Sequence, residues 1–177
     1  MTRTRNAFLG ALAALLIPVA ANADLNDAAA NLTDNGTYTS DKTTGLDWLD
    51  LTVTANTTYD SAETNNPGWR YATNAEVEAL FALFFEPTFV DSGDGSQEST
   101  DADSIAESTL FISLLGAPIN NDPYFSALGY YLDEDDILRA MGTEYETNVV
   151  ALIIGPEWYL QYGGSARQGY GTYLVRE

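Results

Sequence analysis

Cysteine and histidine are both missing from the 177 residues of this sequence. Their absence excludes disulfide bonds, thiolate metal sites, imidazole ligands for zinc or copper, and a Ser-His-Asp catalytic triad. Any bound metal would need oxygen ligands, and calcium is the natural candidate for such a site outside the cell. A domain of this length can nevertheless bury enough apolar surface to fold without disulfides.

Positive charge is scarce as well, because 7 Lys and Arg residues stand against 26 Asp and Glu residues. Two arginines precede residue 24 and every acid lies at or after it, so residues 24–177 hold five cations, 26 acids and a formal charge of −21. Nucleic acids, sulfated polyanions and anionic membranes are bound through Lys and Arg, so we expect none of them as a partner. Strong acidity is typical of proteins that stay soluble in saline surroundings.

Residues 1–23 have the pattern of a secretory signal peptide. Two arginines give the segment a positive start, residues 8–20 are apolar, and Ala21-Asn22-Ala23 places small residues before a cleavage site at Asp24. The apolar stretch is shorter than the roughly 20 residues that span a membrane. We therefore expect a secreted protein, periplasmic or extracellular, whose residues 24–177 form a single globular domain without a membrane span.

The best-marked helix of the sequence begins after Thr73. Thr73 and Glu76 have the spacing of a capping box, in which each residue satisfies a backbone amide of the other. The apolar residues that follow recur at i, i+3, i+4 and i+7 and so share one helix face: Val77, Leu80, Phe81 and Phe84. Arg70, just before this helix, is expected to pair with a fixed carboxylate or carbonyl group.

The rest of the chain predicts a second main helix, a short helix over residues 58–63 and several short strands. Residues 104–115 are helical in pattern and are followed by Gly116 and Pro118, which end a helix. Alternating or continuous apolar runs predict strands at 37–40, 46–51, 124–132, 137–141, 147–154 and 170–176. The predicted fold class is α+β, with two main helices on one side of a mostly antiparallel, twisted sheet.

Two acidic stretches interrupt these elements. Residues 91–103 contain almost no apolar side chains and predict a flexible, solvated loop; the alternative is a calcium loop, built from Asp91, Asp94, Glu98, Asp101 and Asp103. The second stretch is predicted to be the charged tip of a hairpin, and the alternative is an oxygen-ligated metal site, built from Asp133, Glu134, Asp135 and Asp136.

Four segments occur in a recognisable order: 32–38 (Leu-Thr-Asp-Asn-Gly-Thr-Tyr), 44–50 (Thr-Gly-Leu-Asp-Trp-Leu-Asp), 68–73 (Gly-Trp-Arg-Tyr-Ala-Thr, followed by Glu76) and 171–176 (Gly-Thr-Tyr-Leu-Val-Arg). In these segments the sequence resembles uncharacterised bacterial secreted proteins of the PEP-CTERM-associated type. More distantly, it is similar to the Lcl C-terminal domain, which pairs a Gly-Leu-x-Trp strand with a Trp-Arg-Leu-Pro-Thr helix start. Formylglycine-generating-type domains share a similar helix start.

The resemblance implies a C-type-lectin-like fold, in which the first and last strands pair and close a loop. Two functions of the similar proteins do not carry over. Binding of sulfated polysaccharides needs a basic surface, and formylglycine formation needs cysteines, and this sequence has neither. The sequence also lacks a Pro-Glu-Pro motif with an apolar helix and a basic end, so we do not expect cell-surface sorting by that route.

Aromatic residues indicate a function in binding. They are frequent in the final third of the chain: Tyr130, Tyr131, Trp158, Tyr159, Tyr162, Tyr170 and Tyr173. Aromatic faces stack on sugar rings, so we expect a non-catalytic module that binds an extracellular polysaccharide or a surface protein, with these candidate ligand-binding residues: Trp158, Tyr159, Tyr162 and Tyr170. The alternative is that these aromatics are core residues and cross-strand pairs.

Two other functions remain open from the sequence. One is a glycoside hydrolase working with paired carboxylates, for which Glu144, Glu146 and Glu157 are the candidates. The other is a structural subunit of an extracellular assembly, which an exposed apolar patch or an unprotected edge strand would favour. No catalytic residue is assigned in the preferred interpretation, and calcium is the only cofactor considered.

Overall fold

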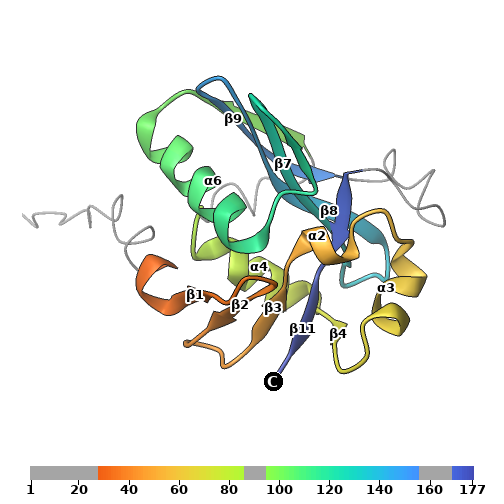
Figure 1. Cartoon of the computed structure of the whole chain (residues 1–177). Helices are drawn as coiled ribbons and strands as arrows, with labels where there is room; N and C mark the ends of the chain where they lie inside the picture. Colours follow the sequence, from red (N-terminus) through yellow and green to blue (C-terminus); the bar gives the residue numbers. More distant parts are fainter. Residues whose placement is uncertain (1–27, 86–94, 156–168) are drawn as a thin grey trace, which may run out of the picture.

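The computed structural model describes residues 28–85, 95–155 and 169–177, which form an α+β arrangement (Figure 1). This confirms the predicted fold class. The sequence suggested one sheet, whereas the strands divide into a five-stranded and a six-stranded sheet. Among the described helices, none is long and apolar enough to cross a membrane. The predicted signal peptide, residues 1–23, lies outside the described residues.

The five-stranded sheet is antiparallel throughout. Its strands, in spatial order, are β1 (Leu32–Asp34), β2 (Tyr38–Asp41), β3 (Asp47–Leu49), β11 (Leu174–Arg176) and β4 (Arg70–Tyr71). The strand from the end of the sequence thus lies between strands from its first half, with Val175 opposite Trp48 and Arg176 opposite Asp47. The expected pairing of an early and the final segment is present through β3, whereas the first strand, β1, pairs with β2 instead.

The six-stranded sheet contains the longer strands. In spatial order these are β10 (Tyr170–Thr172), β7 (Tyr124–Leu132), β8 (Leu138–Glu146), β9 (Val149–Gly155) and β5 (Gly95–Ser99), with β6 (Ile119–Asn121) also paired to β7. Only the β10–β7 pair is parallel among the described strands. The described helices are α2 (Leu51–Thr54), α3 (Tyr59–Asn65), α4 (Asn74–Ala82) and α6 (Ala102–Leu115).

Tyr173 joins the two sheets. The sequence predicted one strand over residues 170–176, but the chain leaves the six-stranded sheet after β10 and enters the five-stranded sheet at β11. The Tyr173 amide donates to the Tyr130 carbonyl on β7, and its own carbonyl accepts from the amide of Ala72, next to β4. Its buried hydroxyl donates to the Met141 carbonyl on β8 at 3.0 Å.

The capping box at the start of α4 is present as predicted. The Thr73 amide donates to Glu76 Oε2 at 2.8 Å, and the Glu76 amide donates to Thr73 Oγ1 at 3.3 Å. Arg70 has the partner that the sequence called for, because its guanidinium donates to both Glu76 oxygens at 2.7 and 2.9 Å. The Arg70 hydrogen bond lowers the pKa of Glu76 to about 2.

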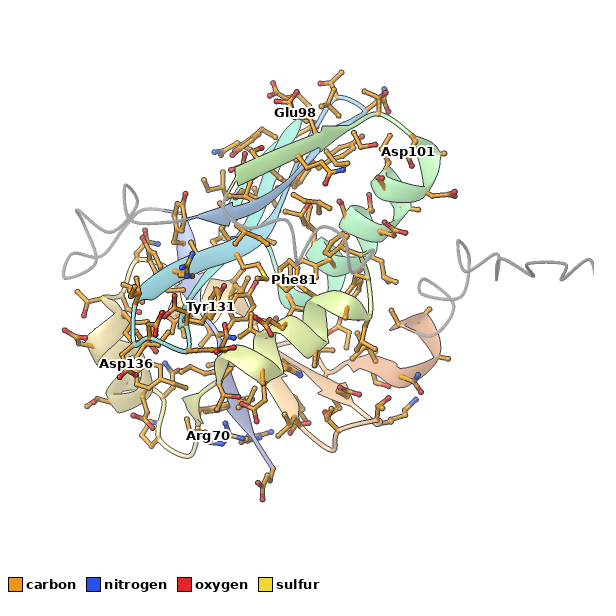
Figure 2. The ribbon with its side chains drawn as sticks, turned by 180° about the vertical axis from the view of Figure 1, so that it is seen from behind. Arg70, Phe81, Glu98, Asp101, Tyr131 and Asp136 are labelled. Atoms are coloured by element: carbon orange, nitrogen blue, oxygen red, sulfur yellow. The ribbon has the colours of Figure 1, made fainter. Side chains whose placement is uncertain are left out.

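Aromatic side chains fill the space between the sheets and the helices α4 and α6. Phe111 on α6 packs against Phe81 and Phe84, with ring centroids 5.0 and 5.1 Å apart. Phe84 is buried although α4 ends at Ala82. Figure 2 shows Phe81 and Tyr131 in the interior, whereas Glu98 and Asp136 lie at the periphery.

The described part of residues 91–103 is not the flexible loop that the sequence predicted. Residues 95–99 form β5, an edge strand that pairs with β9 along its whole length. Asp101 caps α6, accepting from the Ser104 amide at 2.8 Å. A polar edge strand escapes a search for apolar periodicity because its stability comes from the backbone ladder rather than from buried side chains. Asp91 and Asp94 lie outside the described residues.

Candidate functional site

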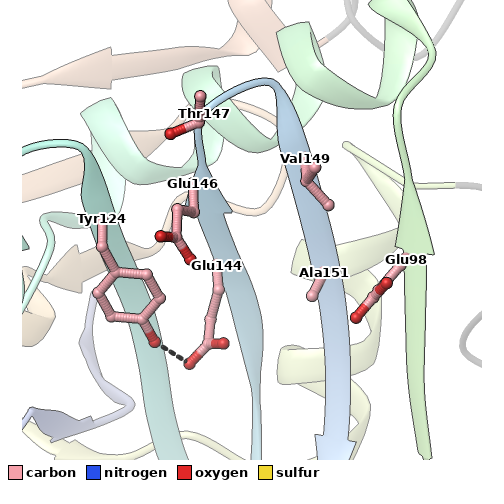
Figure 3. A pocket seen from close by; sticks show the side chains of 7 residues that line it. All are labelled: Glu98, Tyr124, Glu144, Glu146, Thr147, Val149 and Ala151. Atoms are coloured by element: carbon pink, nitrogen blue, oxygen red, sulfur yellow. Dashed lines mark hydrogen bonds between the residues drawn. The ribbon is translucent and has the colours of Figure 1, made fainter.

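A pocket of about 350 Å³ lies on the six-stranded sheet, over β7, β8, β9 and β5 (Figure 3). Its lining residues are Glu98, Tyr124, Glu144, Glu146, Thr147, Val149 and Ala151; we call it the Tyr124 pocket. Thr143 donates to Ser108 of α6 at 2.9 Å, so this helix covers the face to which Thr143 points. Glu144 is the next residue in β8, and it therefore points to the opposite face.

Strand register brings the lining residues together. Residues directly opposite one another in neighbouring strands point to the same face. One row across the sheet contains, from β7 to β9, Tyr124, Glu146 and Val149. The next row contains, from β7 to β5, Ser126, Glu144, Ala151 and Glu98.

A tight turn fixes this register. Thr147 and Asn148 connect β8 to β9 and have φ angles of 44° and 67°. Positive φ at both central residues is the signature of the two-residue turns whose twist suits a β-hairpin. The turn places Glu146 opposite Val149, and every later pair of the hairpin follows from that pairing.

Tyr124 and Glu144 form the polar centre of the pocket. The Tyr124 hydroxyl donates to Glu144 Oε1 at 2.5 Å, and the Ser126 hydroxyl donates to the same oxygen at 3.4 Å. Burial, together with this bond to the carboxylate, raises the pKa of the Tyr124 phenol well above its ordinary value. The phenol therefore remains a neutral donor at all moderate pH values.

The carboxylates of the pocket are arranged in two ways. Glu144 and Glu146 are two residues apart on β8 and point to the same side. Glu98 lies on the far side of Ala151, so its backbone is two strand spacings, about 10 Å, from that of Glu144. Such a site offers hydrogen-bond acceptors over an apolar floor, which Val149 and Ala151 provide.

The structure partly assembles the carboxylates that the sequence singled out for hydrolysis. Glu144 and Glu146 line one pocket, and Glu157 lies outside the described residues. Tyr124 and Glu98 were missed as partners of Glu144. Alternation along β7 could have placed Tyr124 and Ser126 on one face, but the sequence holds no signal for the strand order that brings Glu98 close.

The predicted aromatic binding site is not supported by the one member of it that lies within the described residues. Trp158, Tyr159 and Tyr162 lie outside the described residues. The assignment of Tyr170 to an exposed ligand surface is wrong, because Tyr170 is only 7% exposed and stacks on Tyr130 with ring centroids 5.3 Å apart. Strand aromatics pack in the core or against cross-strand neighbours, and here the buried alternative holds.

The acidic quartet forms the hairpin tip between β7 and β8. Asp133 Oδ1 accepts from the amides of Asp135 and Ile137, each at 2.9 Å, and its other oxygen accepts from Arg139. The predicted metal site formed by Asp133, Glu134, Asp135 and Asp136 requires correction. In the described parts of the chain, no three acidic residues converge to hold a metal ion. Asp133 instead satisfies the amides of its own turn.

Comparison with protein-family models, curated proteins and solved structures found no match to this chain. The resemblance to PEP-CTERM-associated secreted proteins and to the Lcl C-terminal domain therefore stays a prediction.

Proposed function

We propose that this protein is a secreted, non-catalytic module that binds an extracellular polysaccharide, with the Tyr124 pocket as its binding site. The observation that carries the proposal is the position of Tyr124, Glu144 and Glu98 around one pocket, on the sheet face opposite α6. The pattern of residues 1–23 supports export.

The chemistry of the pocket favours a ligand rich in hydrogen-bond donors. Carboxylates accept strong hydrogen bonds from hydroxyl and ammonium groups, and Val149 and Ala151 offer an apolar surface to the C–H side of a sugar ring. Three Glu side chains and a net charge of −19 repel sulfated or uronic-acid polymers. The matching ligand is a neutral or amine-bearing polysaccharide.

A binding role fits the carboxylate geometry better than hydrolysis does. Glycosidases place their two carboxyl groups on opposite sides of the scissile bond. Glu144 and Glu146 extend side by side from one strand, and the Glu144 carboxylate is engaged by Tyr124. Glycoside hydrolysis is the second candidate, because Glu98 and Glu144 lie on opposite sides of Ala151 in one row across the sheet, an arrangement that could place a carboxyl group on each side of a bound sugar.

The test is a glycan-array screen followed by titration calorimetry on the Glu144→Gln variant. Loss of a charged acceptor should weaken binding by about 10-fold to 100-fold. Glu63→Gln, an exposed change of the same kind on α3, is the matched control and should bind like wild type. A folded protein that binds no neutral or amine-bearing glycan, or a Glu144→Gln variant of unchanged affinity, would contradict the proposal. Turnover of chromogenic glycosides that Glu98→Gln abolishes would establish the hydrolase instead.

A further inference from the structure

The strand β5 presents a regular edge at the border of the six-stranded sheet. All five of its residues pair with β9 in an unbroken register from Gly95 to Ser99. Among the described strands it has no neighbour on its other side, and the side chains of residues 95–98 are exposed. The other edge strands, β1, β4, β6 and β10, have only two or three residues each.

β5 lacks most of the features that usually protect such an edge. Edge strands are commonly blocked by charged side chains, lysine above all, by proline, by a β-bulge or by very short length. The sequence of β5 is Gly-Ser-Gln-Glu-Ser, in which Glu98 is the one charged residue; it contains neither lysine nor proline, and its register with β9 contains no bulge. Its unpaired backbone groups can therefore accept another extended strand.

We propose that β5 pairs antiparallel with β5 of a second copy of this chain, joining the two six-stranded sheets into one. The sequence of the strand favours itself as partner. In a register centred on Gln97, each Glu98 lies opposite a Ser96 hydroxyl of the other copy, and Gln97 lies opposite Gln97. No like charges face each other directly, which is the main electrostatic requirement for a cross-strand pair.

The symmetry of this pairing has a consequence for binding. The two-fold axis between antiparallel strands is perpendicular to the sheet, so both copies present the same face to the same side. Glu98 belongs to β5 and also lines the Tyr124 pocket, so the two pockets lie on one face on either side of the junction. This consequence rests on the proposed function: a polymer could then occupy both pockets, and the linked sites would raise its apparent affinity.

The pairing is tested by sedimentation of the purified protein without any ligand, over a range of concentrations and at about 0.05 M and about 0.5 M salt. We expect a weak dimer whose population rises with salt, because screening reduces the repulsion between two chains of net charge −19. A monomer at every protein and salt concentration would overturn the proposal. This holds even if β5 then proves to pair with a different extended peptide, because the proposed partner is a second copy of this chain.

Charge substitution at Gln97 tests the register. Gln97→Glu and Gln97→Lys each place like charges opposite one another, and each should weaken the dimer by on the order of fivefold. A mixture of the two variants should recover dimers by pairing opposite charges. Asn65→Asp, an exposed charge added on α3, is the control and should leave the dimer nearly unchanged. A dimer that ignores both Gln97 variants, or no recovery in the mixture, would place the interface elsewhere. If the protein bound no glycan, the proposed function would be refuted, but the evidence for a dimer formed through β5 would be unaffected.

Discussion

Asp50 is a buried carboxyl group that should make the stability of the fold depend on pH. It lies between β3 and α2, is only 8% exposed, and its Oδ1 atom has no hydrogen-bond partner among the described residues. Burial, with a smaller contribution from the nearby Asp34 carboxylate, raises the pKa of Asp50 from 3.8 to about 6. Between about pH 4 and pH 6 the folded state therefore holds a proton that the unfolded state releases.

The magnitude follows from the shift in pKa. A rise from 3.8 to about 6 is worth about 3 kcal/mol, at about 1.4 kcal/mol for each pKa unit. The contribution of Asp50 therefore makes the folded state less stable as the pH rises. Below about pH 4 the carboxyl is protonated in both states and costs nothing, and between about pH 4 and pH 6 the unfolded state gains the advantage of ionising. Above the folded pKa the full cost is present.

Asp50→Asn removes this titration and keeps the shape of the side chain. Asp50 makes no capping hydrogen bond to α2, so the amide loses no such contact. The unfolding free energy of the variant should exceed that of wild type by up to about 3 kcal/mol more at about pH 7.5 than at about pH 4. Urea unfolding followed by tryptophan fluorescence at several pH values measures the difference.

Two controls separate Asp50 from the general acidity of the chain. Asp60→Asn removes an exposed carboxylate on α3 and should change the unfolding free energy little at any pH. Asp34→Asn removes the second cause of the Asp50 shift and should reproduce a small part of the Asp50→Asn effect. A difference between Asp50→Asn and wild type that stays constant with pH would refute the reasoning.

Two further predictions concern packing and the start of α4. Gly171→Ala should destabilise the fold by about 1–3 kcal/mol or more, because a Cβ at this position would lie 2.5 Å from the Leu51 carbonyl oxygen. Gly95→Ala is the control, because a Cβ there would have no atom within 4 Å. Thermal unfolding of both variants measures the difference. Glu76→Gln should cost about 1–2 kcal/mol at neutral pH by weakening the Arg70 pair and the capping box. Because the pKa of Glu76 is lowered to about 2, this deficit should shrink as pH falls from about 4.5 toward 2, and a deficit independent of pH would contradict the assignment.

The local signals in the sequence were sufficient for the two longest described helices, α4 and α6, but not for α2, where the sequence predicted the end of a strand. The Thr73 and Glu76 spacing marked the start of α4, and a Gly at position 116 with φ of 77° ends α6 where expected. Capping and periodicity act over a few residues, so they can be read without knowing the fold. The pairing of the terminal segments came from the resemblance rather than from any local pattern.

The candidate site depends on contacts that local patterns do not encode. Glu144 and Glu146 share a face because they are two residues apart, which the sequence could indicate. Glu98 joins them only because β5 pairs with β9, more than 50 residues away in the sequence. Tyr170 was misassigned for a different reason. The sequence of a strand does not distinguish an aromatic residue that faces a ligand from one that stacks on a neighbour, as Tyr170 does on Tyr130.

The split between β10 and β11 bears on how the two sheets fold. Seven consecutive residues, Tyr170 to Arg176, supply a border strand to one sheet and an interior strand to the other. Without this stretch both sheets are incomplete, and Trp48 has no Val175 opposite it. The two sheets should therefore fold as one cooperative unit, because the same seven residues belong to both.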